Sequence, residues 1–121
     1  MEKKVKDFLN KGLYKVNGSL WIEENGQRFF GPGPVELLEH IERTGSISKG
    51  AKAMGMSYKK AWELVNRINT LSAHPFVVTS IGGEDGGGST ISGEAKEMIA
   101  YYRGLRERFR LFLEKESEVL K

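Results

Sequence analysis

The sequence predicts a mainly helical α+β fold, and three observations support this class. Apolar residues recur at helical spacing through much of the chain, for example at Leu37, Leu38 and Ile41. Serines suited to helix N-caps precede several of these stretches. Short apolar runs beside Asn-Gly and glycine-rich turns indicate two β-hairpins. The 121 residues are enough for one modest core.

The bulk composition is that of an ordinary soluble protein, with 39% hydrophobic and 29% charged residues. The chain has no cysteine, which excludes disulfides, thiolate metal sites and cysteine nucleophiles. No apolar run approaches the roughly 20 residues of a membrane span. The first residues also lack the apolar stretch of a signal peptide. We therefore expect a cytoplasmic protein with no membrane partner.

The N-terminal part is expected to contain a helix and a hairpin. Apolar residues at helical spacing predict a short amphipathic helix over Glu2–Lys11, ended by Gly12. Leu20–Glu23 and Gln27–Phe30 flank Asn25-Gly26, a pair that tolerates the positive φ angles of a tight turn. These two runs are predicted to be antiparallel strands.

The middle of the chain predicts a helix-turn-helix. A first helix is expected to begin at Pro34 and to stop at Gly45. Ser46 is placed to cap a second helix that ends at Gly55, and Ser57 to cap a third. Two helices joined by a short turn containing glycine form this supersecondary structure. The alternative is a plain helical hairpin within a core.

The segment after the third helix predicts a wing. Phe76–Thr79 and Thr90–Ile91 are expected to be strands, joined by the glycine-rich tip Gly82–Gly88. This tip lacks the Lys-Thr ending of a nucleotide-binding P-loop. The predicted fold is therefore a winged helix-turn-helix with an N-terminal β-hairpin and a long C-terminal helix.

The C-terminal helix carries a heptad pattern. Ser92 is expected to cap it, and its apolar positions alternate spacings of four and three, as in a coiled-coil seam. We predict that this helix forms a homodimer and divide the chain into a winged-helix domain, 1–92, and a dimerisation helix, 93–121. The predicted dimer contacts are Met98, Tyr102, Leu105, Phe109 and Phe112, and the pattern continues through Glu116 and Val119.

The basic charge is concentrated in the predicted helix-turn-helix. The whole chain has a net charge of +3, but Ser46–Leu71 alone carries +4, from five lysines and arginines against the single acid Glu63. The rest of the chain therefore sums to −1. This distribution indicates a surface that faces an anion. The alternative is an ordinary solvated helix face.

The third helix presents residue types that suit double-stranded DNA. Its first turn holds Tyr58, Lys59 and Lys60, where recognition helices contact the major groove. Asn66 can read adenine and Arg67 guanine, which would give sequence specificity. The predicted DNA-binding residues are Lys49, Lys52, Ser57, Tyr58, Lys59, Lys60, Asn66, Arg67, Ser80 and Ser89.

Other residues near this surface favour a different role or no role in binding. Trp62 lies at the border of the inner and outer faces, so we expect a buried aromatic, with a DNA contact as the alternative. Glu84 and Asp85 in the wing tip repel phosphate, and a tip that makes no contact is an open alternative for this loop. His40 and His74 are far apart in sequence and have no cysteine beside them, so no metal site is expected. With no catalytic constellation either, we expect neither an enzyme nor a cofactor.

The run GSISKGAKAMGMSYKKAWELVNRINTLSAHPFVV, followed by GGEDGGGSTIS, resembles the DNA-binding domain of the ModE-type molybdate-responsive transcriptional regulators. The resemblance covers about residues 20 to 121 and rests on GSIS, SYKKAW, an asparagine near the helix end and the glycine-rich wing. It implies a winged-helix dimer, related to the DNA-binding heads of LysR-type regulators, that binds palindromic operators.

The chain departs from this family in its length. Members that sense molybdate use β-barrel domains that follow the DNA-binding head, and this chain ends at Lys121. No molybdate-binding residue is therefore carried over, and no oxyanion is expected to bind. Two alternatives remain for the function. One is a winged-helix module that binds a partner protein. The other is an oxyanion sensor that holds molybdate or tungstate between subunits, near Arg103 and Arg106.

Overall fold

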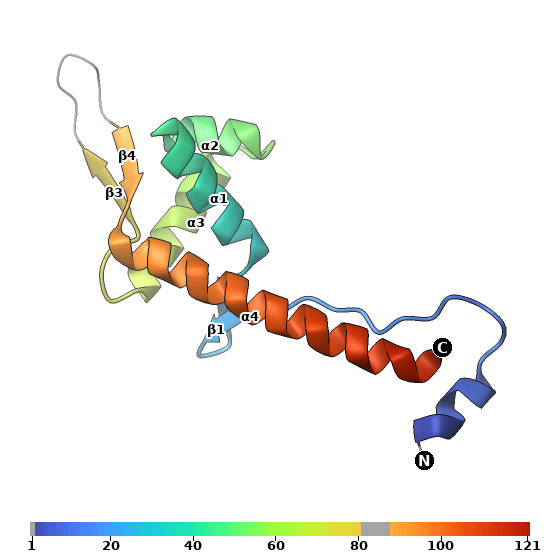
Figure 1. The fold of residues 1–121 in the computed structure, drawn as a ribbon. Helices are drawn as coiled ribbons and strands as arrows, with labels where there is room; N and C mark the ends of the chain where they lie inside the picture. Colours follow the sequence, from blue (N-terminus) through green and yellow to red (C-terminus); the bar gives the residue numbers. More distant parts are fainter. Residues whose placement is uncertain (1, 81–87) are drawn as a thin grey trace. The chain divides into compact units, whose positions relative to one another are not determined.

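The computed structural model describes residues 2–80 and 88–121 and confirms the mainly helical α+β class (Figure 1). Four α-helices and two antiparallel hairpins are present in this part of the chain. In chain order the elements are a 3-10 helix, η1 (Glu2–Phe8), β1 (Ile22–Glu24), β2 (Gln27–Phe30), α1 (Pro32–Thr44), α2 (Ile47–Ala53), α3 (Tyr58–Leu71), β3 (Val77–Ser80), β4 (Gly88–Ile91), α4 (Gly93–Ser117) and a second 3-10 helix, η2 (Glu118–Leu120).

The chain forms two compact units. One comprises residues 21–100 and the other comprises residues 1–20 together with 101–121. The sequence placed the N-terminal residues with the winged-helix domain, whereas the structure groups them with the end of α4. The reason is a set of long-range hydrogen bonds between the segment that precedes β1 and α4.

The core of the larger unit lies between α1, α2, α3 and the strands. Leu37, Leu38 and Ile41 of α1 are completely buried, as their helical spacing predicted. Below them Phe30 meets Phe76 edge to face, with ring centroids 6.0 Å apart. Figure 1 shows the three helices gathered beside the β3–β4 hairpin.

Both hairpins form where the sequence predicted them. In β1–β2, Asn25 and Gly26 have φ angles of 48° and 85°, the left-handed conformation that this pair tolerates. β3 and β4 pair in register from Val77 opposite Ile91 to Ser80 opposite Gly88. The tip that was expected between them, Gly82–Gly88, lies outside the described residues except for Gly88. Glu84 and Asp85 lie outside them too.

The predicted element boundaries shift by a few residues. α1 begins at Pro32 instead of Pro34, because Gly31 already provides an extended N-cap. β1 is limited to Ile22–Glu24, where it pairs with β2 through an irregular register. The N-terminal helix is a 3-10 helix over Glu2–Phe8, shorter than the predicted Glu2–Lys11. Its Phe8 side chain is 81% exposed, so it gains little from burial.

In the smaller unit, an extended segment runs along the last part of α4 (Figure 1). The Tyr102 hydroxyl donates a hydrogen bond to the Leu20 carbonyl over 2.8 Å. Further along, the Val16 amide donates to the Ser117 hydroxyl at 2.8 Å. Ser117 in turn donates to the carbonyl of Leu113. These bonds hold an irregular backbone against the helix.

Candidate nucleic-acid interface

The two helices of the helix-turn-helix begin at the serines that the sequence indicated. The Ser46 hydroxyl accepts a hydrogen bond from the Lys49 amide, and the Ser57 hydroxyl accepts one from the Lys60 amide, both over 3.1 Å. Each bond satisfies an amide that has no partner within its own helix. Gly55, with φ of +66°, allows the sharp turn between the helices. The start of α3 is therefore fixed by local interactions.

The helices approach closely because α2 carries small residues toward α1. An ideal Cβ on Gly50 would lie only 3.2 Å from the Ile41 Cγ1 atom. Ala51 and Ala61 are completely or almost completely buried as well. The Gly50 contact thus joins α1 to α2, whereas α3 packs on the core through its own buried residue Ala61.

The residues of α3 that were predicted to bind DNA lie on its exposed face. Ala61, Val65 and Ile68 are buried on the inner side. The residues that lie outside are Tyr58, Lys59, Lys60, Trp62, Glu63, Asn66, Arg67 and Thr70. Lys49 and Lys52 of α2 are also exposed. The positive end of the α3 dipole adds to the attraction for anions at its first turn.

The prediction that Trp62 is buried is wrong. Its side chain is 49% exposed, and Tyr58, one turn before it, is 55% exposed. The inner side of α3 is formed instead by residues that include Ala61 and Val65, both of which are buried. Trp62 therefore belongs to the outer face of the helix.

Arg67 contacts a neighbouring element that sequence reasoning did not associate with it. One guanidinium nitrogen donates to the Arg28 carbonyl of β2 at 3.3 Å. The Arg28 guanidinium itself lies 3.6 Å from the centre of the Trp21 ring, within the range of a cation–π interaction. The β1–β2 hairpin thus orients the exposed Arg67 near the end of α3. No local sequence signal joins residues that are 39 positions apart.

The base of the wing is held to α3 by Asn69, which the sequence did not assign to any role of its own. The Asn69 side-chain oxygen accepts from the amides of Phe76 and Val77, at 2.8 and 3.1 Å. Its nitrogen donates to the Val77 carbonyl at 3.0 Å. One side chain therefore links the start of the wing to α3.

The two serines predicted to assist the wing differ in accessibility. Ser80 is exposed, and its hydroxyl lies within hydrogen-bonding distance of Gly88 in the opposite strand. Ser89 is only 5% exposed, and its amide donates to the Gly45 carbonyl at 2.8 Å. Its amide thus attaches β4 to the end of α1, and its contact with DNA stays a prediction.

A shallow notch of about 270 Å³ lies where the first turns of α2 and α3 meet the wing. Five of its seven lining residues carry a side-chain hydroxyl. The lining residues are Ser46, Ile47, Ser48, Tyr58, Thr79, Gly88 and Ser89. Hydroxyls and helix N-termini are groups that contact the DNA backbone in known complexes. The notch joins the two helices and the wing into one continuous surface.

The predicted seam on α4 is only partly available to a second copy. Tyr102 is 1% exposed and bonds within its own chain, so its side chain is already covered there, and its role in the dimer stays a prediction. Met98, Leu105 and Phe109 are half-buried, whereas Phe112 is 55% exposed. The Phe109 and Phe112 rings stack with centroids 6.4 Å apart.

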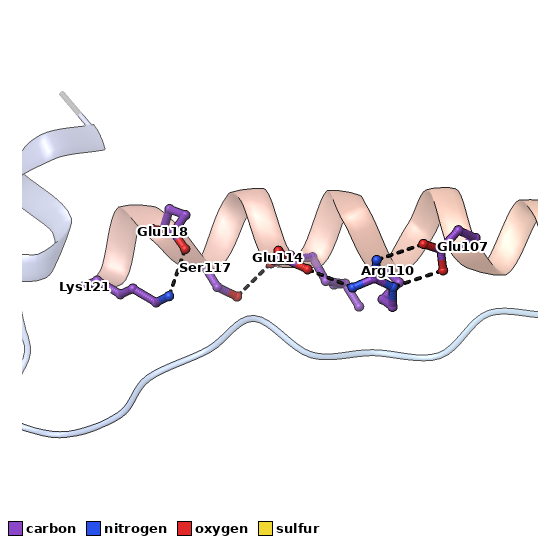
Figure 2. A network of polar contacts seen from close by, with 7 residues as sticks. Glu107, Arg110, Glu114, Ser117, Glu118 and Lys121 are labelled. Carbon is purple, nitrogen blue, oxygen red and sulfur yellow. Dashed lines mark hydrogen bonds and ion pairs between the residues drawn. The ribbon is translucent and has the colours of Figure 1, made fainter.

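The polar residues near the end of α4 form ion pairs along the helix. Figure 2 shows the Arg110 guanidinium between the carboxylates of Glu107 and Glu114, each 2.8 Å away. The hydrogen bond from Arg110 lowers the pKa of the Glu107 carboxyl below its usual value. Arg103 and Arg106, the residues of the oxyanion alternative, are both exposed on the same helix.

The described residues contain no cluster of three or more His, Asp or Glu side chains that would hold a metal ion. None of the helices in this part of the chain is both long and apolar enough to span a membrane.

A helix-turn-helix, a two-stranded wing and a basic outer face on the second helix together define a winged helix-turn-helix protein. No family model matches the chain. Individual proteins do match it. It is 40% identical to the molybdenum transport protein ModE of Azotobacter vinelandii over 86 residues, which are 71% of this chain and 32% of that protein.

Two further relatives agree with this match. The DNA-binding transcriptional dual regulator ModE of Escherichia coli (strain K12) is 43% identical over 74 residues, 61% of this chain and 28% of the relative. The molybdenum-pterin-binding protein MopB of Rhodobacter capsulatus is 43% identical over 81 residues, 67% of this chain and 30% of the relative. The chain thus spans about a third of the length of these curated relatives. Over this stretch the resemblance to ModE-type regulators is confirmed.

Proposed function

We propose that this chain binds double-stranded DNA sequence-specifically and acts in the cytoplasm as the DNA-binding part of a ModE-type transcriptional regulator. The observation that carries the proposal is the outer face of α3, where Lys59, Lys60 and Asn66 are exposed on a capped and firmly packed helix. Lysines in the first turn would bind phosphates while Asn66 reads a base edge. A DNA-binding regulator is among the relatives, which adds support.

In the proposed mechanism, electrostatic attraction to phosphates provides affinity, and contacts to the bases provide sequence specificity. Lys49 and Lys52 on α2 extend the positive surface beyond α3. Each lysine that neutralises a phosphate releases bound counterions, so affinity falls as salt rises. Contacts from α3 to the bases then distinguish the operator from other DNA sequences.

We also propose that the regulator binds as a homodimer through α4. Phe112 lies in the heptad pattern of this helix, and its side chain is exposed in the single chain, where a second copy would cover it. A two-fold dimer would present two recognition helices to half-sites roughly 34 Å apart. The two-fold symmetry of such a dimer requires an operator with inverted repeats.

Selection of bound duplexes from a random pool tests the DNA-binding proposal. We expect an enriched inverted repeat, and a plot of log affinity against log salt with a negative slope. Lys59→Ala with Lys60→Ala should make that slope shallower by about 1.8, at roughly 0.9 per lost phosphate contact. Affinity near 0.1 M salt should fall by about tenfold or more.

The matched control is Lys11→Ala with Lys15→Ala, which removes the same charge from exposed positions in the N-terminal segment. This variant should keep the parent slope. If neither double variant changes the slope, or if the selection enriches no sequence, the proposed function is wrong.

A further inference from the structure

Two large aromatic side chains lie exposed on the outer face of α3. Tyr58 and Trp62 are 55% and 49% exposed, and a separation of four residues places them on one side of the helix. Both side chains have large apolar surfaces, and their exposure to water does not stabilise the helix. Their position indicates a partner that covers them.

The surroundings of these rings restrict the chemistry of that partner. Lys59 and Lys60 directly follow Tyr58 in the sequence, and Asn66 follows Trp62 by one turn. Glu63 is the single acid within α2 and α3. An apolar surface on another protein would leave these lysines without a counter-charge. The partner therefore combines negative charge at its edges with small apolar groups between them.

The major groove of DNA has this combination. Phosphates line its rims, and the 5-methyl group of thymine is the apolar feature that the bases present on its floor. An indole has one polar atom, a donor, so most of its contact surface suits a methyl group better than a hydrogen-bonding base edge. The other base edges in the groove offer hydrogen-bond donors and acceptors.

We propose that Trp62, with Tyr58 one turn before it, recognises thymine 5-methyl groups in the major groove and so determines part of the sequence preference. This inference rests on the proposed DNA-binding function and specifies how one face of α3 reads bases. Lys59 and Lys60 supply attraction to the phosphates, whereas the aromatic pair distinguishes thymine from cytosine.

Replacement of thymine by uracil isolates the methyl group, because uracil pairs identically and lacks only that group. The probe is the duplex enriched from the random pool, prepared once with thymine and once with uracil throughout. At one salt concentration, the parent protein should bind the uracil duplex about fourfold more weakly for each methyl group it contacts. Single replacements would then locate the contacted positions.

Substitution variants show whether Trp62 causes the preference for the thymine duplex. For Trp62→Ala, the ratio of the affinity for the thymine duplex to that for the uracil duplex should fall about fourfold below the parent ratio, or to one if Trp62 makes the single methyl contact. Tyr101→Ala is the matched control, because Tyr101 is 54% exposed on α4 and outside the helix-turn-helix. It should retain the full ratio even if its overall affinity changes.

The outcomes separate this inference from the function on which it rests. A parent protein that binds both duplexes equally overturns the thymine contact and leaves DNA binding intact. A Trp62→Ala variant that keeps the parent ratio shows that another residue contacts the methyl groups. A protein that enriches no duplex at all contradicts the proposed function itself. The parent comparison needs no variant, so it stays decisive if Trp62→Ala does not fold.

Discussion

Asn69 closes a pair of hydrogen bonds with the backbone of Val77, donating to its carbonyl at 3.0 Å and accepting from its amide at 3.1 Å. The same side chain also accepts from the Phe76 amide. These contacts replace the backbone partners that an isolated strand end would lack. The Asn69 amide group therefore helps to fix the orientation of the wing relative to α3.

Asn69→Ala should lower the free energy of unfolding by about 2–3 kcal/mol, because partly buried backbone groups of Phe76 and Val77 lose their partners. Urea denaturation measures this change. Asn66→Ala is the control, since Asn66 is exposed on the same helix, and it should change stability by less than about 0.5 kcal/mol. Equal effects of the two substitutions would show that Asn69 does not hold the wing.

Ser57→Ala should destabilise the protein by about 1 kcal/mol, because the first turn of α3 loses its side-chain cap to the Lys60 amide. Ser48→Ala removes a hydroxyl from an exposed position of α2 that caps no helix, and it should be nearly neutral. The midpoint of thermal unfolding compares the two variants. A neutral Ser57→Ala would mean that water satisfies the helix start equally well.

The features that the sequence predicted correctly are those set by neighbours along the chain. Ser46 and Ser57 cap helices, and Gly45 and Gly55 adopt positive φ, because each depends on only a few adjacent residues. The helical spacing of apolar residues also placed the buried side of α1 correctly. For the same reason the exposed basic residues of α3 were identified.

Sequence reasoning is weakest where distant segments decide the environment of a side chain. Helical spacing placed Trp62 at a border, and only the packing of α3 on the rest of the core shows on which side it lies. Tyr102 fits a heptad pattern, but the segment that ends at Leu20 covers it. Ser89 is buried against Gly45, which is 44 residues away in the sequence. Periodicity describes one element and carries no information about what covers it.

Gly50→Ala should destabilise the protein by about 1 kcal/mol. The added methyl group gains helix propensity, but it would lie 3.2 Å from Ile41 Cγ1 and crowd the contact between α1 and α2. Gly93→Ala at the start of α4 provides the contrast, since no atom outside its immediate chain neighbours lies within 4 Å of its Cβ position. That variant should gain roughly 0.5 kcal/mol. If urea denaturation shows that both substitutions raise the free energy of unfolding, α1 and α2 accommodate the added methyl group without cost.

Tyr102 predicts a loss of stability at alkaline pH. Burial raises the pKa of its phenol above the usual value of 10.0, although nearby Arg106 acts in the opposite direction. The unfolded chain therefore loses this proton at a lower pH than the folded chain. The stabilisation is complete below pH 10 and disappears as the pH rises through the folded pKa.

Tyr102→Phe tests this pH dependence. At neutral pH it should cost about 1 kcal/mol, because the Leu20 carbonyl loses its donor. Between pH 9 and about pH 11 the variant should lose less stability than the parent protein. Tyr101→Phe changes an exposed phenol and should follow the parent curve. Parallel curves for the parent and Tyr102→Phe would contradict the role of the buried phenol.

Phe112→Asp should separate the proposed dimer. Phe112 is 55% exposed in a single chain and lies in the heptad pattern. Burial of a phenylalanine contributes roughly 1.5–3 kcal/mol, and a two-fold interface contains the substitution twice. The dissociation constant should therefore rise by a factor of about 10² to 10⁴. Light scattering at micromolar concentration should then report a monomer.

Leu111→Asp is the matched control for the dimer, because Leu111 is 50% exposed but lies one position away from the heptad pattern. On a helix, adjacent residues face directions about 100° apart, so the same charge at this position should leave the dimer intact. If both variants become monomeric, the contact surface is broader than the heptad pattern. If neither does, α4 does not form the dimer, and the spacing of the two recognition helices has to be set by another surface.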